Sequence, residues 1–214
     1  MLGRIRGSEP QMSSAYAVVW LNLRRRCPSL RTILVAGASS QADPSAAAIE
    51  LAEVAAELDA ASVLVMVLDS AMRDRREPDS SNPSVTVVAA LSPRQIRMAL
   101  SDPSEEFKFV IVVAPAPQIN ADGIAVAGAA DVAMLVATAG RTPFADAQLA
   151  ADLLRHAGVP VAAALLVTSR ERRTRGVMDA RIRRSSSRGR RVAELRQGGL
   201  DDEPPEQVAV GNEA

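Results

Sequence analysis

Short apolar runs alternate along the chain with segments whose apolar residues recur at helical spacing. Runs rich in Val, Leu, Ile and Ala are predicted to be strands and cover residues 32–37, 62–68, 85–89, 107–113, 132–138 and 160–168. Helices are predicted at 45–58, 93–100 and 143–157, and a helix or turn at 119–130. Several strands are apolar on both faces, which is typical of a parallel sheet covered by helices. The alternation predicts an α/β fold, a mostly parallel central sheet flanked by helices, with residues 63–68 and 110–113 in central strands.

The sequence divides into an N-terminal segment, a single α/β domain and a C-terminal tail. The predicted bounds are 1–30, 31–168 and 169–214. The N-terminal segment holds an amphipathic helix, in which we expect Trp20 to pack against the domain; an anchor for another protein is the alternative. Residues 170–196 contain eleven Arg against three acidic residues, and residues 201–214 contain five acidic and no basic residues. Both stretches are poor in large apolar residues, so the tail is predicted to be largely disordered.

Composition narrows the classes of function. The chain is 48% hydrophobic and 23% charged, enough for a buried core, and its formal net charge of zero predicts no global attraction to nucleic acid. One cysteine and one histidine exclude a disulfide scaffold and a Cys/His zinc cluster. No run of about 18 apolar residues is present. We expect a cytoplasmic protein, at most peripheral at the inner membrane, where residues 170–196 would meet anionic headgroups.

The loop between the first strand and the following helix is the candidate ligand site. In open parallel sheets ligands bind at the carboxyl ends of the strands, and a helix N-terminus there offers N–H groups to phosphate. Residues 36–46 read AGASSQADPSA. A phosphate-binding loop needs glycines and a lysine, whereas here Asp43 would repel phosphate and Pro44 lacks an N–H donor. We expect Asp43 to cap the helix, with Pro44 and Ser45 in its first turn.

Five segments of the chain match a known series of motifs in their order and spacing. They are SAYAVVWLNL at 14–23, VAGASSQADPSAAAIELA at 35–52, DSAMR at 69–73, FKFVIVVAPA at 107–116, and residues 122–131 followed by GRT at 140–142. The series resembles the cytoplasmic domain of the bacterial tyrosine kinases (BY-kinases) of capsule and exopolysaccharide assembly, which are relatives of the MinD/ParA P-loop ATPases. The resemblance covers residues 14–168 and implies a P-loop NTPase-like fold of the SIMIBI type.

Departures from the family pattern fall on its nucleotide-binding positions. Ser45 stands at the magnesium-binding Ser of the first motif and Asp69 at the first Asp of the second, so these are the two retained cofactor positions. The altered positions, which include the loop lysine and the Walker B aspartate, are Asp43, Pro44, Ala46, Ala71 and Val113. The only lysine, Lys108, precedes the fourth strand and is expected at the opposite edge of the sheet. Because phosphoryl transfer depends on Lys, Mg²⁺ and acidic ligands, the resemblance implies that no residue here is catalytic.

The resemblance implies a catalytically inactive BY-kinase-like protein that acts as a regulator or partner in exopolysaccharide or capsule biosynthesis. Its expected partner is a membrane protein that controls polysaccharide chain length (a co-polymerase) or an active kinase paralogue. No cofactor is expected unless the altered loop still binds ATP and Mg²⁺. Two alternatives stay open: a residual ATP-binding or ATPase protein of the MinD/ParA or tyrosine autokinase type, and an adaptor that uses residues 170–196 at a membrane or nucleic acid. Nucleic acid is less favoured, because no aromatic residue lies among the arginines.

Overall fold

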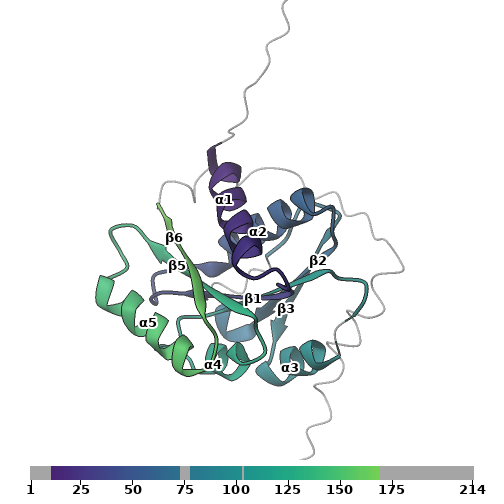
Figure 1. Ribbon diagram of the computed structural model, residues 1–214. Coiled ribbons are helices and arrows are strands. Elements are labelled where there is room, and N and C mark those ends of the chain that lie inside the picture. Colours follow the sequence, from purple (N-terminus) through teal and green to yellow (C-terminus); the bar gives the residue numbers. More distant parts are fainter. Residues whose placement is uncertain (1–10, 73–77, 103, 169–214) are drawn as a thin grey trace, which may run out of the picture. The chain divides into compact units, whose positions relative to one another are not determined.

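A computed structural model describes residues 11–72, 78–102 and 104–168, and these contain a six-stranded sheet covered by helices on both faces (Figure 1). The strands lie in the order β3-β2-β4-β1-β5-β6, and every pairing is parallel. The strand bounds are β1 Thr32–Gly37, β2 Val63–Leu68, β3 Val85–Leu91, β4 Phe109–Ala114, β5 Val132–Thr138 and β6 Val161–Val167. The predicted α/β class is therefore confirmed. The predicted tail lies outside the described residues.

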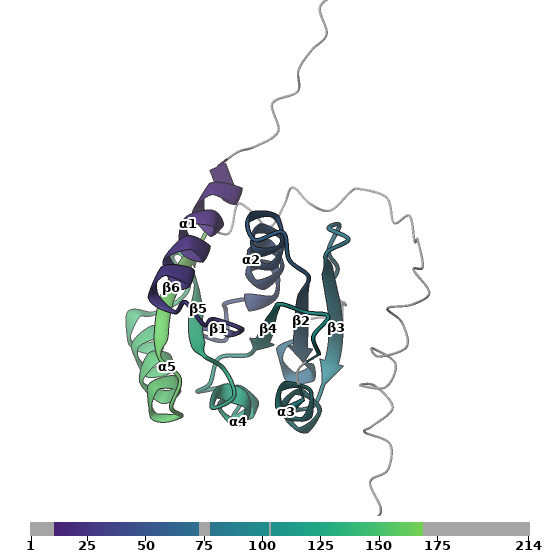
Figure 2. The same ribbon diagram turned by 45° about the vertical axis from the view of Figure 1, so that its right-hand side comes forward.

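Two layers of helices sandwich the sheet. One face carries α1 (Gln11–Arg26) and α2 (Pro44–Leu58). The other carries α3 (Pro93–Ser101), α4 (Asp122–Ala127) and α5 (Phe144–His156), as Figure 2 shows. A short 3-10 helix, η1 (Asp69–Ala71), follows β2. None of the helices in the described part of the chain is both long and apolar enough to cross a membrane.

The strands β1 and β4 lie side by side at the centre of the sheet, and their connections leave on opposite faces. The helix that follows β1 is α2, whereas the helix that follows β4 is α4 on the other face. Every residue of β1, β2 and β4 is buried, as their apolar sequences predict. The carboxyl ends of β1 and β4 therefore form a topological switch point, the place where open α/β sheets bind ligands.

Most element bounds differ from those predicted by one or two residues, and local hydrogen bonds explain the differences at α4 and at the start of β4. The helix expected within residues 119–130 is reduced to α4, because Asn120 Oδ1 accepts a 2.7 Å hydrogen bond from Asp122 N and turns the chain just before the helix. The strand expected from residue 107 starts two residues later as β4. Phe107 N instead donates to Ser104 O in a turn.

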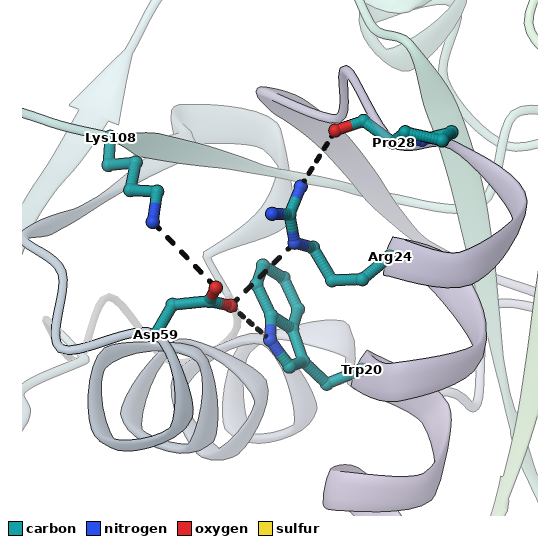
Figure 3. A network of polar contacts seen from close by, with 5 residues as sticks. All are labelled: Trp20, Arg24, Pro28, Asp59 and Lys108. Atoms are coloured by element: carbon teal, nitrogen blue, oxygen red, sulfur yellow. Dashed lines mark hydrogen bonds and ion pairs between the residues drawn. The ribbon is translucent and has the colours of Figure 1, made fainter.

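The helix α1 is fastened to the domain through Trp20, which is fully buried. Its indole Nε1 donates a 2.7 Å hydrogen bond to Asp59 Oδ2 (Figure 3). Its ring meets Phe109 edge-on with 4.8 Å between centroids. Arg24 Nε and Lys108 Nζ each lie 3.7 Å from a carboxylate oxygen of Asp59. Both cations also lie 5.3 Å from the centre of the Phe109 ring. The predicted packing of Trp20 is confirmed.

The position of the single lysine is also as predicted. Lys108 directly precedes β4, and in a parallel sheet the amino ends of all strands share one edge. Its ammonium group is engaged with Asp59, at the C-cap of α2. Lys108 is therefore separated from the loop that follows β1 by the full length of the strands.

Candidate functional site

The candidate site begins where β1 ends and α2 starts. Asp43 has an extended backbone, and its Oδ1 accepts a 3.1 Å hydrogen bond from Ser45 N. Pro44 occupies the first turn and has no N–H. The predicted cap is thus confirmed. This cap places a negatively charged carboxylate at the helix N-terminus. In a phosphate-binding loop, the helix N-terminus is where the phosphate itself binds.

The backbone N–H groups of this loop are largely used within the protein. Ala38 N donates to Val136 O of β5 at 2.8 Å. Gln41 N donates to Ser39 Oγ at 3.3 Å, and Ala42 N donates to Ser39 O at 3.1 Å. Together with Ser45 N, these are the donors that a phosphate cradle would have to present to its ligand.

Side-chain hydrogen bonds join the loop after β1 to the loop after β5. Ser39 Oγ lies 3.1 Å from Thr142 Oγ1, and Thr142 Oγ1 also accepts a 2.9 Å hydrogen bond from Thr138 N. Thr138 Oγ1 in turn donates to Gln41 O at 3.4 Å. Ser39 and Thr138 are both buried. The two loops are therefore held together by polar groups that are largely withdrawn from water.

Gln118 joins the loop after β4 to the same assembly. Its Nε2 donates to Ala38 O at 2.9 Å and to Asp146 O, in the first turn of α5, at 3.4 Å. A Cβ added to Gly37 would lie 3.4 Å from Ala116 N, so the loops after β1 and β4 are also in close contact. We name the set Ser39, Gln118, Thr138 and Thr142 the loop clasp.

The two retained positions of the family pattern lie on different elements. Ser45 is half-buried in the first turn of α2, and Asp69 is exposed at the end of β2, with β4 between their strands. Neither hydrogen bond nor ion pair joins them in the described part of the chain. No three His, Cys, Asp or Glu side chains within the described ranges are grouped so that they could hold a metal ion.

Three of the altered positions lie on three different elements, α2, η1 and β4. Ala46 is exposed and Ala71 is buried beside β2. Val113 is fully buried in the centre of the sheet, in register between Val35 of β1 and Val67 of β2. The position of the Walker B aspartate is thus part of the apolar core.

These residues do not fit a magnesium triphosphate. The loop has no lysine, a carboxylate stands at its helix N-terminus, and the N–H groups described above already have partners. Val113 supplies no ligand for the metal or its water. Hydrogen bonds instead hold the loops after β1, β4 and β5 together at the switch point.

Sequence reasoning missed the loop clasp. Ser39 and Thr142 are 103 residues apart, and periodicity carries no information about contacts at that distance. One signal was available, because Thr142 ends the GRT segment at 140–142. Gln118, a long polar residue after a run of Pro and Ala at a strand end, was a second.

Comparison with known proteins yields matches in structure alone. Neither a family model nor a curated protein sequence matches the chain. The kinase domain of the Escherichia coli tyrosine kinase ETK superposes with a TM-score of 0.59 and 17% identity, covering 80% of each chain. The chimerical protein CapA2B2 gives a TM-score of 0.61 at 12% identity, with 76% of this chain and 86% of that one covered. The BceF tyrosine kinase domain gives 0.57 at 16%, with 72% and 76% covered.

At identities this low, the structural matches establish the fold alone. The chain has the P-loop NTPase-like α/β fold of bacterial tyrosine kinase domains, and the resemblance inferred from the order of its motifs is confirmed at that level.

Proposed function

We propose that this chain is a non-catalytic BY-kinase-like protein that acts as a regulator or partner in exopolysaccharide or capsule biosynthesis. The observation that carries the proposal is the closed loop after β1. It is capped by Asp43, lacks a donor at Pro44 and is tied to its neighbours by the loop clasp. A protein that keeps the fold but lacks the nucleotide-binding residues can still bind other proteins through the surfaces of that fold.

The energetic argument concerns the transition state of phosphoryl transfer. Catalysis of this reaction is mostly positioning and electrostatic stabilisation by Lys, Mg²⁺ and acidic ligands. Loss of one preorganised donor typically raises a barrier by about 3–4 kcal/mol. Here Pro44 and Val113 replace two charged groups, and Asp43 adds a charge of the wrong sign. The combined loss leaves no effective catalyst.

The chain also lacks an accessible tyrosine that could accept phosphate in autophosphorylation. Tyr16 is the only tyrosine of the chain and is buried on α1, with 6% of its surface exposed. A role through protein contact follows more readily from this fold. The partner class we propose is a membrane co-polymerase that controls polysaccharide chain length or an active tyrosine kinase paralogue, met at the cytoplasmic side of the membrane.

Phosphoryl transfer with radiolabelled ATP tests this proposal. The full chain is incubated with Mg-ATP, alone and together with an active tyrosine kinase domain from the same cell. We expect no label on the full chain alone and a changed rate of labelling of the active kinase. Label on the chain alone that disappears in Ser45→Ala would show that the loop is a working nucleotide site and would overturn the proposal. An unchanged rate for the active kinase would remove the kinase paralogue as partner.

A further inference from the structure

The strand β6 stands at one edge of the sheet but has the sequence of an interior strand. Its seven residues, VAAALLV, are all apolar and include neither a charge nor a proline. None of them is buried, and Leu166 has 67% of its surface exposed. The neighbouring β5, with a similar sequence, is buried at six of its seven positions. Natural sheets usually protect such an edge with charges, prolines or bulges, because an unprotected edge pairs with another strand.

The strand at the opposite edge, β3, is irregular where β6 is regular. The pairing of β3 with β2 shifts register between Met66 and Leu68, and Ala90 near the end of β3 has a positive φ of 60°. Irregularities of this kind bend an edge away from regular pairing. On β6 the register shift lies at the start of the strand, and Ala163–Val167 pair regularly with β5. The outer edge of β6 is therefore a regular template for a further strand.

The backbone groups that face outward on β6 follow from its pairing with β5. Val167 O accepts a 2.8 Å hydrogen bond from Ala139 N, so the backbone of Val167 is directed toward β5. Because this direction alternates along a strand, the N–H and C=O groups of Ala164 and Leu166 point away from β5. The side chains of these two residues are also the exposed ones of the strand. Since they are two positions apart, they lie on the same face of the sheet.

This spacing makes the edge complementary to itself. When two copies of β6 lie antiparallel about a two-fold axis at Leu165, Ala164 of one copy faces Leu166 of the other. The two residues of each such pair exchange both of their N–H···O hydrogen bonds, so every outward group of these residues gains a partner. The large side chain of Leu166 then meets a small alanine across the strands, and the two do not collide.

We propose that β6 is the contact between two copies of this chain, paired antiparallel about a two-fold axis at Leu165, so that their sheets become continuous. No charge lies on the strand, so like charges do not meet across the axis. A second copy is a better occupant than a strand of another protein, because two-fold symmetry supplies the matching register and the alanine opposite each leucine.

The helices beside β6 supply further apolar surface for this contact. A stable dimer buries about 800 Å² on each partner, which is more than a short pair of strands provides. The helices α1 and α5 contact β6 from the two faces of the sheet, as Figure 2 shows. Exposed aliphatic side chains are present on both, Val18 and Leu21 on α1 and Leu149 on α5.

The mass of the full chain as a function of its concentration, measured by sedimentation equilibrium, tests this proposal. Leu166→Lys places an ammonium group inside the contact, whereas in a single copy the same group stays in water. Met98→Lys is the matched control, because Met98 on α3 is 58% exposed. We expect wild type and Met98→Lys to form the same dimer. Leu166→Lys should weaken association about 100-fold or more, because a two-fold contact contains the substitution twice.

Amide hydrogen exchange of the same proteins, resolved by NMR, locates the contact. We expect the amides of Ala164 and Leu166 to be protected in the wild-type dimer. They should exchange about 100-fold faster after dilution below the dissociation constant, and also in Leu166→Lys. Unchanged exchange in β1 and β4 would show that the domain of the variant stays folded.

Three results would overturn the proposal. A wild-type monomer at every concentration, with fast exchange at Ala164 and Leu166, would show that the edge stays open. A monomer in which these amides are protected would show that the same chain covers its own edge. A dimer that Leu166→Lys leaves intact would show that the copies meet through another surface.

Discussion

The indole Nε1 of Trp20 donates a 2.7 Å hydrogen bond to the carboxylate of Asp59, a residue 39 positions further along the chain. Asp59 is the C-cap of α2, so the contact joins the N-terminal helix to the end of the helix that starts at the candidate site. The Trp20 side chain is fully buried in its own domain.

The first prediction concerns this attachment. Trp20→Phe keeps an aromatic ring against Phe109 but removes the donor to a charged acceptor, and we expect it to lower the free energy of unfolding by about 2 kcal/mol. Trp20→Ala also leaves a cavity and should cost about 3–5 kcal/mol. Urea unfolding of the full chain measures both. Val18→Ala, on the exposed face of α1, is the control and should stay within about 0.5 kcal/mol.

Equal urea midpoints for Trp20→Ala and Val18→Ala would contradict the packing of α1 on the domain through Trp20.

The free energy of unfolding lost in Trp20→Phe should also depend on Asp59. In Asp59→Asn the indole keeps an acceptor, but Arg24 and Lys108 lose their counter-charge, so the two substitutions together should be non-additive.

The second prediction concerns Asp131, which fixes the start of β1. Its Oδ2 accepts hydrogen bonds from Arg31 N and Thr32 N, each at 2.8 Å, about 100 residues away. Asp131→Ala leaves both donors without this acceptor and should lower the free energy of unfolding by about 1–3 kcal/mol, whereas Asp131→Asn keeps one carboxamide oxygen and should lose less. Asp102→Ala, at an exposed helix end, is the control for urea unfolding. Identical urea midpoints for Asp131→Ala and Asp102→Ala would show that the hydrogen bonds of Asp131 do not stabilise the start of β1.

The third prediction concerns Ala60, which follows α2 with a φ of 46°. A non-glycine residue in this left-handed region is strained by roughly 1 kcal/mol, and helix ends prefer glycine there. Ala60→Gly is therefore expected to raise the thermal midpoint. Ala151→Gly, inside α5, should lower stability by about 1 kcal/mol, because glycine is unfavourable in a helix interior. A fall in both midpoints would show that Ala60 carries no strain.

The fourth prediction concerns the loop clasp. Thr142→Val keeps the shape of the side chain but removes the oxygen that faces Ser39 Oγ and accepts from Thr138 N. We expect the amides of residues 38–42 to exchange about tenfold faster, with little change in β4. Thr86→Val, on the half-exposed face of β3, is the matched control. Unaltered exchange of the loop in Thr142→Val would show that the clasp does not hold it closed.

Much of this fold could be predicted from local patterns. The bounds of β1 and β5 agree with those expected, because each is a continuous apolar run that ends in a residue suited to a turn or cap. The cap at Asp43 was equally accessible, since it depends on two neighbouring residues. Such features need no knowledge of what lies across the sheet.

Contacts between distant segments could not be predicted in this way. Ser39 has an ordinary sequence context, and its partner Thr142 is identified only once β1 and β5 are known to be neighbours. Asp59 was overlooked for the same reason: it ends a helix without any local sign that Trp20, Arg24 and Lys108 converge on it.

The central claim is that the closed loop after β1 cannot hold a triphosphate, and calorimetric titration of the full chain with Mg-ATP tests it most directly. The account predicts no saturable binding tighter than about 1 mM. Micromolar binding that is lost in Ser45→Ala would contradict it.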